Sequence, residues 1–330
     1  MRSAEALAGD RPSSRLARPA SPGLKAAARA VLRRPAQSGQ QARAFFEARF
    51  QPWRIVPAGG AGFLTGYYEP MAPASRVETP DFPWPILGRP PDLVTLAPGE
   101  SPPGFPEGVT GAQLLPGGAL APYVDRETIE RAQAGPIAWL KDAVEAFLIQ
   151  VQGSAQLVFP DGARARLAYD GRNGLPYASI GRMLIEAGEI PEQEMSLKRL
   201  KAWLRAAGLG EGGRGLALMR RNRSFVFFRL VEDFDPALGP VAGAGVPLTP
   251  LRSIAVDRAL WTYGLPFFVE ADLPEGPFRR LLIAQDTGSA IVGPARADIF
   301  FGGGEAAGDR AGAIRHPGQM TVFLPIGEEP

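Results

Sequence analysis

Short apolar runs separated by turn residues fill the C-terminal third of the chain. β-Branched and aromatic residues dominate these runs, which favours strands over helices. Strands with this spacing suit a small closed barrel, which leaves no free sheet edge. We therefore expect a mainly β body. The runs are RSFVFFRL, GVPLTPL, RSIAVD, FFVEA, RRLLIAQD, ADIFFG and MTVFLP.

The middle of the chain alternates helical patterns with one hairpin pattern. Helical spacing of apolar residues covers about 125–134 and 137–150. The segment VQGSAQLVFPDGARARLAYDGRNG then predicts a β-hairpin with Pro-Asp-Gly at its turn. Two more helices are predicted at SIGRMLIEA and SLKRLKAWLRAA, because each begins with a capping serine and is followed by a glycine. These caps are Ser179 with Gly188 and Ser196 with Gly208.

The N-terminal part begins with residues 1–22, rich in Arg, Pro, Ser and Ala, which we expect to form a disordered tail. Two short helices interrupted near Pro35 are predicted over residues 24–50, before AGGAGFLTGYYEPMAP, which predicts a strand entering a turn. The Pro-rich passage from Thr79 to Pro106 is either an interdomain linker or a surface crossing.

Composition limits the class of protein. The chain has 330 residues, 45% of them hydrophobic, which suggests about two domains with real cores. Its formal net charge is only +2, which argues against a dedicated nucleic-acid binder. With no Cys there is no disulfide, thiolate nucleophile or Cys-linked lipid, and a Ser-His-Asp triad would have to use His316, which we expect at the surface.

No apolar run is long enough to cross a bilayer, and the start MRSAEALAGDRP lacks the apolar core of a signal peptide. The protein is therefore either cytoplasmic or recorded from a start that lacks its export signal.

Two aspartates in AQDTGSAIVGPARADIF, residues 284–300, stand in different surroundings. Asp286 follows a Leu-Leu-Ile run and enters a Thr-Gly-Ser turn, which it could simply cap. Asp298 is flanked by Ala297, Ile299 and Phe300. If Ile299 or Phe300 faces its carboxyl group, desolvation would raise its pKa, although strand alternation could point them elsewhere.

Six motifs in order then carry a family resemblance. They are GYYEP at 66–70, QGS at 152–154, YDGRNGLPYASIGR at 169–182, NRSFVFFR at 222–229, RSIAVDR at 252–258 and AQDTGSAIVGPARADIFFG at 284–302. This set resembles the MltA family of lytic murein transglycosylases, over roughly residues 63–325. Two details depart from the family pattern, since Ser289 replaces a glycine and Arg223 replaces a proline, but neither removes a carboxylate.

The resemblance implies a double-psi β-barrel domain with a second, smaller β-domain inserted and a glycan groove between them. We assign residues 23–84 plus 216–330 to the barrel, with the 3D segment at about 230–325, and residues 85–215 to the insertion.

The resemblance also implies an activity. Family members cleave the MurNAc-β-1,4-GlcNAc bond without water and leave a 1,6-anhydro ring, so one carboxyl group can act as acid and then as base. Asp298 matches the catalytic aspartate and Asp286 a supporting one, while Asp257 in IAVDR is expected to be structural.

Further motif residues are candidates for sugar contacts, although each could instead serve its own strand or turn. They are Tyr67, Tyr68, Glu69, Gln152, Ser154, Tyr177, Ser179, Asn222 and Ser224, whereas Arg172 and Asn173 are expected to serve the GRNG turn.

Peptidoglycan is the partner that the resemblance implies, with no nucleic acid, no cofactor and no metal ion, and other cell-wall enzymes are left open. The family implies the cell envelope, the periplasm or the outer membrane, although no lipid-anchor Cys is visible. Two alternatives remain. A water-using muramidase would need a second carboxylate, for which Glu69 and Asp286 are candidates. A non-catalytic glycan-binding envelope protein would show no turnover.

Overall fold

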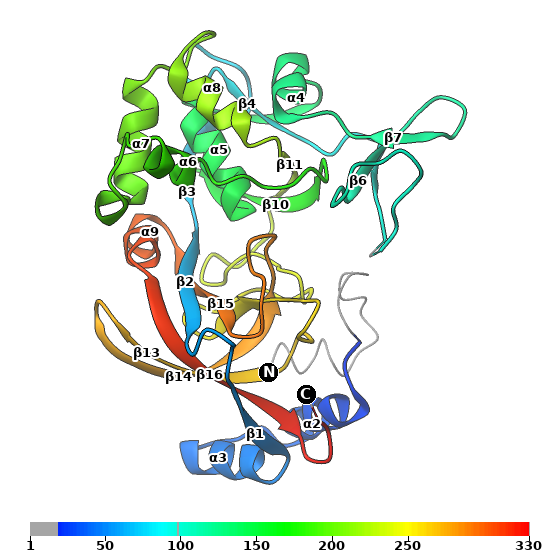
Figure 1. Ribbon diagram of the computed structural model, residues 1–330, viewed down its shortest axis with the longest axis vertical. Coiled ribbons are helices and arrows are strands. Elements are labelled where there is room, and N and C mark those ends of the chain that lie inside the picture. The colour runs from blue at the N-terminus through cyan, green and yellow to red at the C-terminus, as the bar shows by residue number, and fades with distance from the viewer. Residues whose placement is uncertain (1–18, 98, 330) are drawn as a thin grey trace. The chain divides into compact units, whose positions relative to one another are not determined.

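The computed structural model describes residues 19–97 and 99–329. Most of the expected N-terminal tail, residues 1–18, lies outside this range, and helix α2 already begins at Pro22 with Ser21 as its cap. The chain forms two compact units (Figure 1). The barrel unit contains the described residues up to Tyr68, Pro236–Gly302 and those from Ala306 onward, and the second unit contains Glu69–Asp235 and Gly303–Glu305. The insertion expected at 85–215 lies inside the second unit, which also includes residues 69–84 and 216–235.

The barrel unit is built on one sheet that closes on itself. Its strand order is β1-β16-β13-β14-β12-β15-β2, and β16 also pairs with β2, so six strands form a ring to which β1 is added. The predicted mainly β fold with a closed barrel is thus confirmed. The strands are β1 (Phe50–Ile55), β2 (Gly62–Glu69), β12 (Ser253–Val256), β13 (Pro266–Leu273), β14 (Gly276–Asp286), β15 (Arg296–Gly303) and β16 (Arg315–Pro325).

Helices α2 (Pro22–Arg33) and α3 (Gly39–Glu47) are the two helices expected around Pro35, and they pack on β16 and β1. Helix α9 (Glu305–Gly312) was not expected, because the glycines in EAAGDRAG disfavour helix. Burial of Ala307 and Ala311 stabilises it instead. The strand expected at GVPLTPL was wrong, because Pro247 and Pro250 cannot donate ladder hydrogen bonds and this segment has only an isolated bridge.

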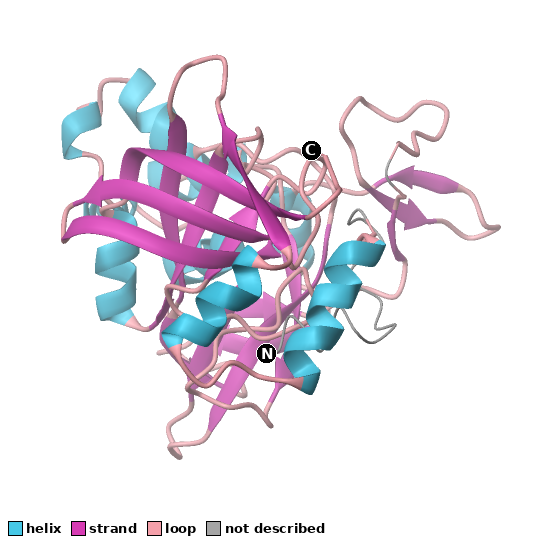
Figure 2. Cartoon of the chain, turned by 90° about the horizontal axis from the view of Figure 1, so that it is seen from below, coloured by secondary structure: helices cyan, strands magenta, loops and turns pink. Residues whose placement is uncertain are grey.

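The second unit contains a six-stranded sheet in the order β11-β10-β9-β3-β8-β4 and a separate small sheet β5-β6-β7. Figure 2 shows the helices of the chain in cyan and its strands in magenta. The strands are β3 (Met71–Ser75), β4 (Trp84–Leu87), β5 (Leu93–Thr95), β6 (Gly111–Leu114), β7 (Leu120–Pro122), β8 (Pro136–Leu140), β9 (Ser154–Val158), β10 (Arg164–Arg172) and β11 (Val226–Val231). The helices are α4 (Arg126–Ala132), α5 (Ala143–Gln152), α6 (Ile180–Glu186), the 3₁₀ turn Glu192–Glu194, α7 (Leu197–Ala206) and α8 (Arg214–Arg221).

Helix α5 connects two cores of this unit. Its residues Ala146 and Ile149 pack with Leu157 and Leu167 of the sheet. Its other side, including Val144, packs against the cluster formed by α6, α7 and α8. Because apolar residues cover both sides, α5 has little amphipathic pattern, as expected for a buried helix.

The hairpin with its Pro-Asp-Gly turn, the helix at about 125–134 and both serine caps are confirmed. The single helix expected over 137–150 was wrong in its first part, because β8 pairs with β3 and β4 before α5 begins. The passage Thr79–Pro106 is not an interdomain linker, since its strands β4 and β5 belong to sheets of the second unit. Among the described residues, no helix has both the length and the apolar composition that a bilayer crossing requires.

Candidate active site

Asp286 and Asp298 lie on either side of one small residue of the barrel. Ala255 of β12 pairs with Asp298 of β15 in antiparallel register and with Asp286 of β14 in parallel register, after a bulge. Two strand spacings separate the aspartates, which places their Cα atoms roughly 10 Å apart. Ala255, the residue between them, is small and buried.

Strand alternation decides which neighbours face Asp298. Ile254 and Ile299 pair in register and are fully buried, so they occupy the face opposite to Ala255 and Asp298. Ile299 therefore does not desolvate the carboxyl group, whereas Phe300 shares its face. The Phe300 ring lies 5.3 Å from the ring of Tyr67, between centroids, and helps exclude water from this part of the barrel surface.

A chain of hydrogen bonds leads to the Asp298 carboxyl group. The Thr65 hydroxyl donates to Oδ1 of Asp298 at 2.6 Å, and Nη2 of Arg296 donates to the same Thr65 oxygen at 2.8 Å. Nη1 of Arg296 donates to the carbonyl oxygen of Ala297 at 2.6 Å, which fixes the guanidinium group in place. Oδ1 of Asp298 thus accepts from Thr65, whose oxygen in turn accepts from the Arg296 cation.

Opposing effects set the protonation of Asp298. Burial raises its pKa to about 6, and the nearby Asp286 carboxylate acts in the same direction. The hydrogen bond from Thr65 and the charge of Arg296 lower it. A carboxyl group in this balance can both give and accept a proton near neutral pH.

Asp286 has a different set of partners. Tyr67 donates its hydroxyl to Oδ2 at 2.9 Å, and the backbone N–H groups of Thr287 and Gly243 donate to Oδ1 at 2.9 and 3.3 Å. One oxygen of Asp286 thus caps backbone N–H groups, and the other accepts from the Tyr67 side chain. Burial raises the pKa of Asp286 and, more strongly, that of Tyr67, so Tyr67 stays a proton donor.

Gly243 permits this arrangement, because a Cβ atom there would collide with the hydroxyl of Tyr263. The Asp257 side chain, by contrast, accepts hydrogen bonds from backbone groups. Its two oxygens accept from the N–H groups of Ala259 at 2.9 Å and of Gly293 at 2.8 Å. His316 lies in β16 opposite Leu64 and is partly exposed.

Glu69 is buried within the second unit. Arg166 donates to both of its oxygens at 2.6 and 2.9 Å, and Gln156 donates to Oε2 at 2.9 Å. Burial raises the Glu69 pKa, and Arg166 opposes this effect. Tyr68, the last residue of the first barrel-unit segment, is also buried, with its ring against Gly308 of the same unit.

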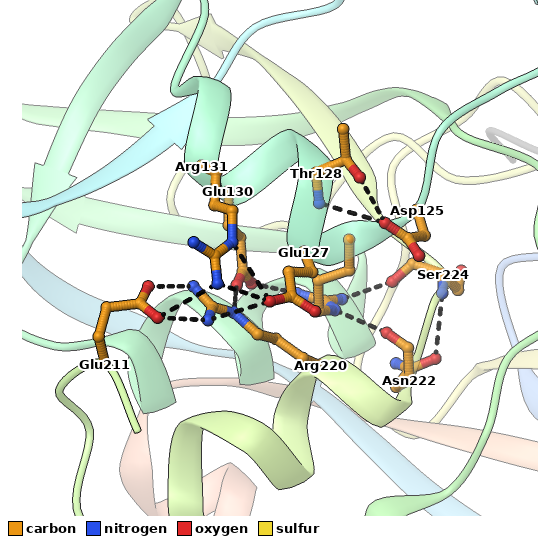
Figure 3. A network of polar contacts seen from close by, with 10 residues as sticks. Asp125, Glu127, Thr128, Glu130, Arg131, Glu211, Arg220, Asn222 and Ser224 are labelled. Atoms are coloured by element: carbon orange, nitrogen blue, oxygen red, sulfur yellow. Dashed lines mark hydrogen bonds and ion pairs between the residues drawn. The ribbon is translucent and has the colours of Figure 1, made fainter. Parts of the chain in front are cut away.

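Asn222 and Ser224 belong to a buried polar network around Arg126, part of which appears in Figure 3. Arg126 donates to the carbonyl oxygens of Asn222 and Ser224, while Oδ1 of Asn222 accepts from the N–H groups of Ala178 and Ser224. Asn173 joins neighbouring loops in the same way. These side chains serve the loops that carry them.

The remaining candidates in the second unit differ in exposure. Ser154 is buried, Ser179 is exposed and caps α6, and Gln152 and Tyr177 are partly exposed. Arg172 donates to the Thr110 hydroxyl at 2.8 Å. Among residues 19–97 and 99–329, no three His, Cys, Asp or Glu side chains gather as a metal site would require.

Thr65 and Arg296 were not among the site residues predicted from the motifs. Both could have been found from strand period, because Thr65 precedes Tyr67 by two residues and Arg296 precedes Asp298 by two. Arg166 and Arg126 were not predicted either, and the sequence contains no comparable signal for them, since their partners come from distant segments.

Known proteins resemble the chain along most of its length. The family model described as MltA specific insert domain matches residues 63–229, and the 3D domain model matches residues 252–324. Membrane-bound lytic murein transglycosylase A of Escherichia coli K12 is 30% identical over a 297-residue alignment that covers 87% of this chain and 73% of the relative.

Solved structures agree with these matches. The crystal structure of the membrane-bound lytic murein transglycosylase from Agrobacterium tumefaciens is 36% identical, with 98% of this chain and 91% of that chain covered and a TM-score of 0.86. Escherichia coli MltA with bound chitohexaose is 27% identical, with coverages of 92% and 82% and a TM-score of 0.68.

Proposed function

The chain belongs to the MltA family of lytic murein transglycosylases, and we propose that Asp298 alone performs both proton transfers of its reaction. The reaction cleaves the MurNAc-β-1,4-GlcNAc bond of peptidoglycan and forms a 1,6-anhydro end. In the first step the Asp298 proton moves to the glycosidic oxygen while the bond from C1 to that oxygen breaks, and the bonding electrons leave with the oxygen. In the second step the Asp298 carboxylate takes the proton from the C6 hydroxyl as O6 bonds to C1. Asp298 ends protonated, and no water is consumed.

The single observation that carries this proposal is the balanced setting of Asp298. Burial beside Phe300 and Asp286 favours the acid, whereas Thr65 and Arg296 stabilise the carboxylate. A general acid works best when its pKa lies near the working pH, and the same holds for the base that it becomes.

Asp286 serves in this proposal as a supporting group. Its charge favours the protonated form of Asp298, and its oxygens hold Tyr67 and the loop of Gly243. A muramidase would instead need a second carboxylate free to act as nucleophile or to activate water. Both oxygens of Asp286 already accept hydrogen bonds, and Glu69 is buried against Arg166, which favours the transglycosylase.

Among the candidates for sugar contacts, we retain Tyr67 in the barrel unit and Gln152, Tyr177 and Ser179 in the second unit, because their side chains are at least partly exposed. Glu69, Asn222 and Ser224 are assigned instead to holding their own unit together, because they are buried and hydrogen-bonded internally. Tyr68 and Ser154 are buried and join this group.

We further propose that the barrel unit and the second unit are the two domains of the enzyme. We propose the cell envelope as its location, because murein lies there and family membership supports it. Its E. coli and A. tumefaciens relatives are named as membrane-bound. Peptidoglycan glycan strands are the proposed partner, and the E. coli relative with chitohexaose bound supports a glycan-binding role.

Digestion of purified murein tests the function. The expected products carry 1,6-anhydro-MurNAc and are lighter by one water than muramidase products. Digestion in H₂¹⁸O separates the two reactions further, because only hydrolysis places ¹⁸O in the new end. Labelled products would favour a muramidase, and absence of turnover by the wild-type protein would favour a glycan-binding role.

A further inference from the structure

The hydrogen bonds around Thr65 have a fixed direction. A guanidinium group can only donate, so the Thr65 oxygen must accept from Nη2 of Arg296. Arg296 is held in turn by the carbonyl oxygen of Ala297 and by the ring of Phe63, 5.2 Å from the centroid to its central carbon. The one hydroxyl proton of Thr65 then points to Oδ1 of Asp298, at 2.6 Å.

This direction makes the two oxygens of Asp298 unequal. Oδ1 receives the Thr65 proton in both protonation states, so the proton of the neutral acid belongs on Oδ2. Within the described part of the chain, no hydrogen bond is made to Oδ2. Oδ2 is thus the atom available to a substrate.

We propose that Arg296 is a positioning residue which, through the Thr65 hydroxyl, fixes Oδ2 of Asp298 as the oxygen that carries and exchanges the catalytic proton. The proposal rests on the proposed function of Asp298. It adds that the same oxygen gives the proton to the leaving sugar and later takes one from the C6 hydroxyl. The carboxyl group therefore need not rotate between the two steps.

Few charged or titratable groups face Asp298. Arg296 on its own strand is the cation that acts on it, and Asp286 on β14 is the anion. Tyr67 on β2 lies beside both aspartates, and Tyr263 follows β12 and lies near Asp286. Burial raises the pKa of each tyrosine, so both are neutral in the range where Asp298 titrates.

Removal of the Thr65 hydroxyl or of the Arg296 charge should therefore leave the Asp298 carboxylate less stabilised. We expect its pKa to rise by about one unit in Thr65→Val and Arg296→Met. Valine keeps the β-branched shape that suits a strand, and Thr65→Ser is the matched variant that keeps the hydroxyl. Arg296→Lys keeps the charge but not the two-pronged geometry that bonds Thr65 and Ala297 together.

The test measures this pKa directly and separately from activity. Protein labelled with ¹³C at the aspartate carboxyl carbons is titrated by NMR, and the Asp298 signal is assigned by its loss in Asp298→Asn. Far-UV circular dichroism and the thermal midpoint check that each variant is folded. The pH dependence of kcat/KM on soluble murein glycan is then recorded for the same proteins.

The proposal requires a higher Asp298 pKa in Thr65→Val and Arg296→Met and a near wild-type pKa in Thr65→Ser. The basic limb of each variant's pH profile of kcat/KM should move by the same amount as its Asp298 pKa. Folded Thr65→Val and Arg296→Met proteins with an unchanged Asp298 pKa would overturn it, as would a lower rate with an unmoved basic limb. If the pKa moves as expected but wild-type protein makes no anhydro product, the proposed function fails while the hydrogen-bond chain stands.

Discussion

Replacing Asp298 with asparagine should remove activity and, at neutral pH, stabilise the fold. Asparagine keeps the shape of the side chain but cannot transfer the proton, so activity on murein should fall by about 10²- to 10⁴-fold. The effect on stability follows from the raised pKa. The folded chain holds the Asp298 proton up to about pH 6, whereas the ordinary value is 3.8. The native state therefore binds more protons than the unfolded state between these pH values.

The sign and size of the stability effect follow from this difference. Because the native state binds more protons, the free energy of unfolding falls as pH rises from about 4 through about 6. A rise of roughly two units corresponds to at most about 3 kcal/mol. Asparagine does not titrate, so Asp298→Asn should gain up to about that much relative to wild type at pH 7.5 and little at pH 4.

Urea unfolding of the wild-type and Asp298→Asn proteins at pH 4 and pH 7.5 measures this stability difference, taken from the unfolding transition that includes the barrel. All other titrating groups are common to the two proteins, so the change in their stability difference between the two pH values isolates Asp298. If the asparagine variant gains nothing between pH 4 and pH 7.5, burial does not hold the Asp298 proton, and the acid role loses its physical basis.

Three further outcomes are expected. Tyr67→Phe removes the hydrogen bond to Asp286, so the Asp286 pKa should rise further and the free energy of unfolding should fall by about 1 kcal/mol. Carboxyl ¹³C NMR measures the pKa and urea unfolding measures the stability. An unchanged Asp286 pKa would contradict the contact. Arg166→Met leaves Glu69 buried without its cation and should lower the free energy of unfolding by about 3–5 kcal/mol, part of which the double variant with Glu69→Gln regains. The exposed control Arg182→Met should lower it by less than about 1 kcal/mol. Equal losses in Arg166→Met and Arg182→Met would show that burial of the Glu69 pair does not matter. EDTA should leave the rate of murein digestion unchanged, because the internal hydroxyl and one carboxyl group suffice, and a loss restored by zinc or magnesium would contradict this mechanism.

The sequence predicted best those features that depend on neighbouring residues. Strand runs such as RSIAVD, the Pro-Asp-Gly turn and the Ser179 and Ser196 caps are local, and each lies where expected. The segment at 136–140 was misjudged because its apolar residues fit either period, and pairing with β3 and β4 decides it as a strand.

The site followed the same rule. Asp298 was predicted as a site residue from a motif, but its setting depends on Thr65, which is 233 residues away in the chain. Glu69 is a second example, since it was a candidate from its motif and the structure bonds it to Arg166 and Gln156, which lie far away in the chain. No local pattern reports which distant cation a buried carboxylate will meet.

Closure of the barrel also determines when the enzyme can become active. Strand β2 pairs with β15 and β16, so the ring cannot form until nearly the whole chain, including the intervening second unit, has been made. Such long-range pairing is slow, because the entropy of loop closure must be overcome before its contacts form. The bond between Thr65 and Asp298 therefore cannot form before β15 has been made. A chain that stops before β15 lacks Asp298, so the proposed proton transfers become possible only after β15 has been made.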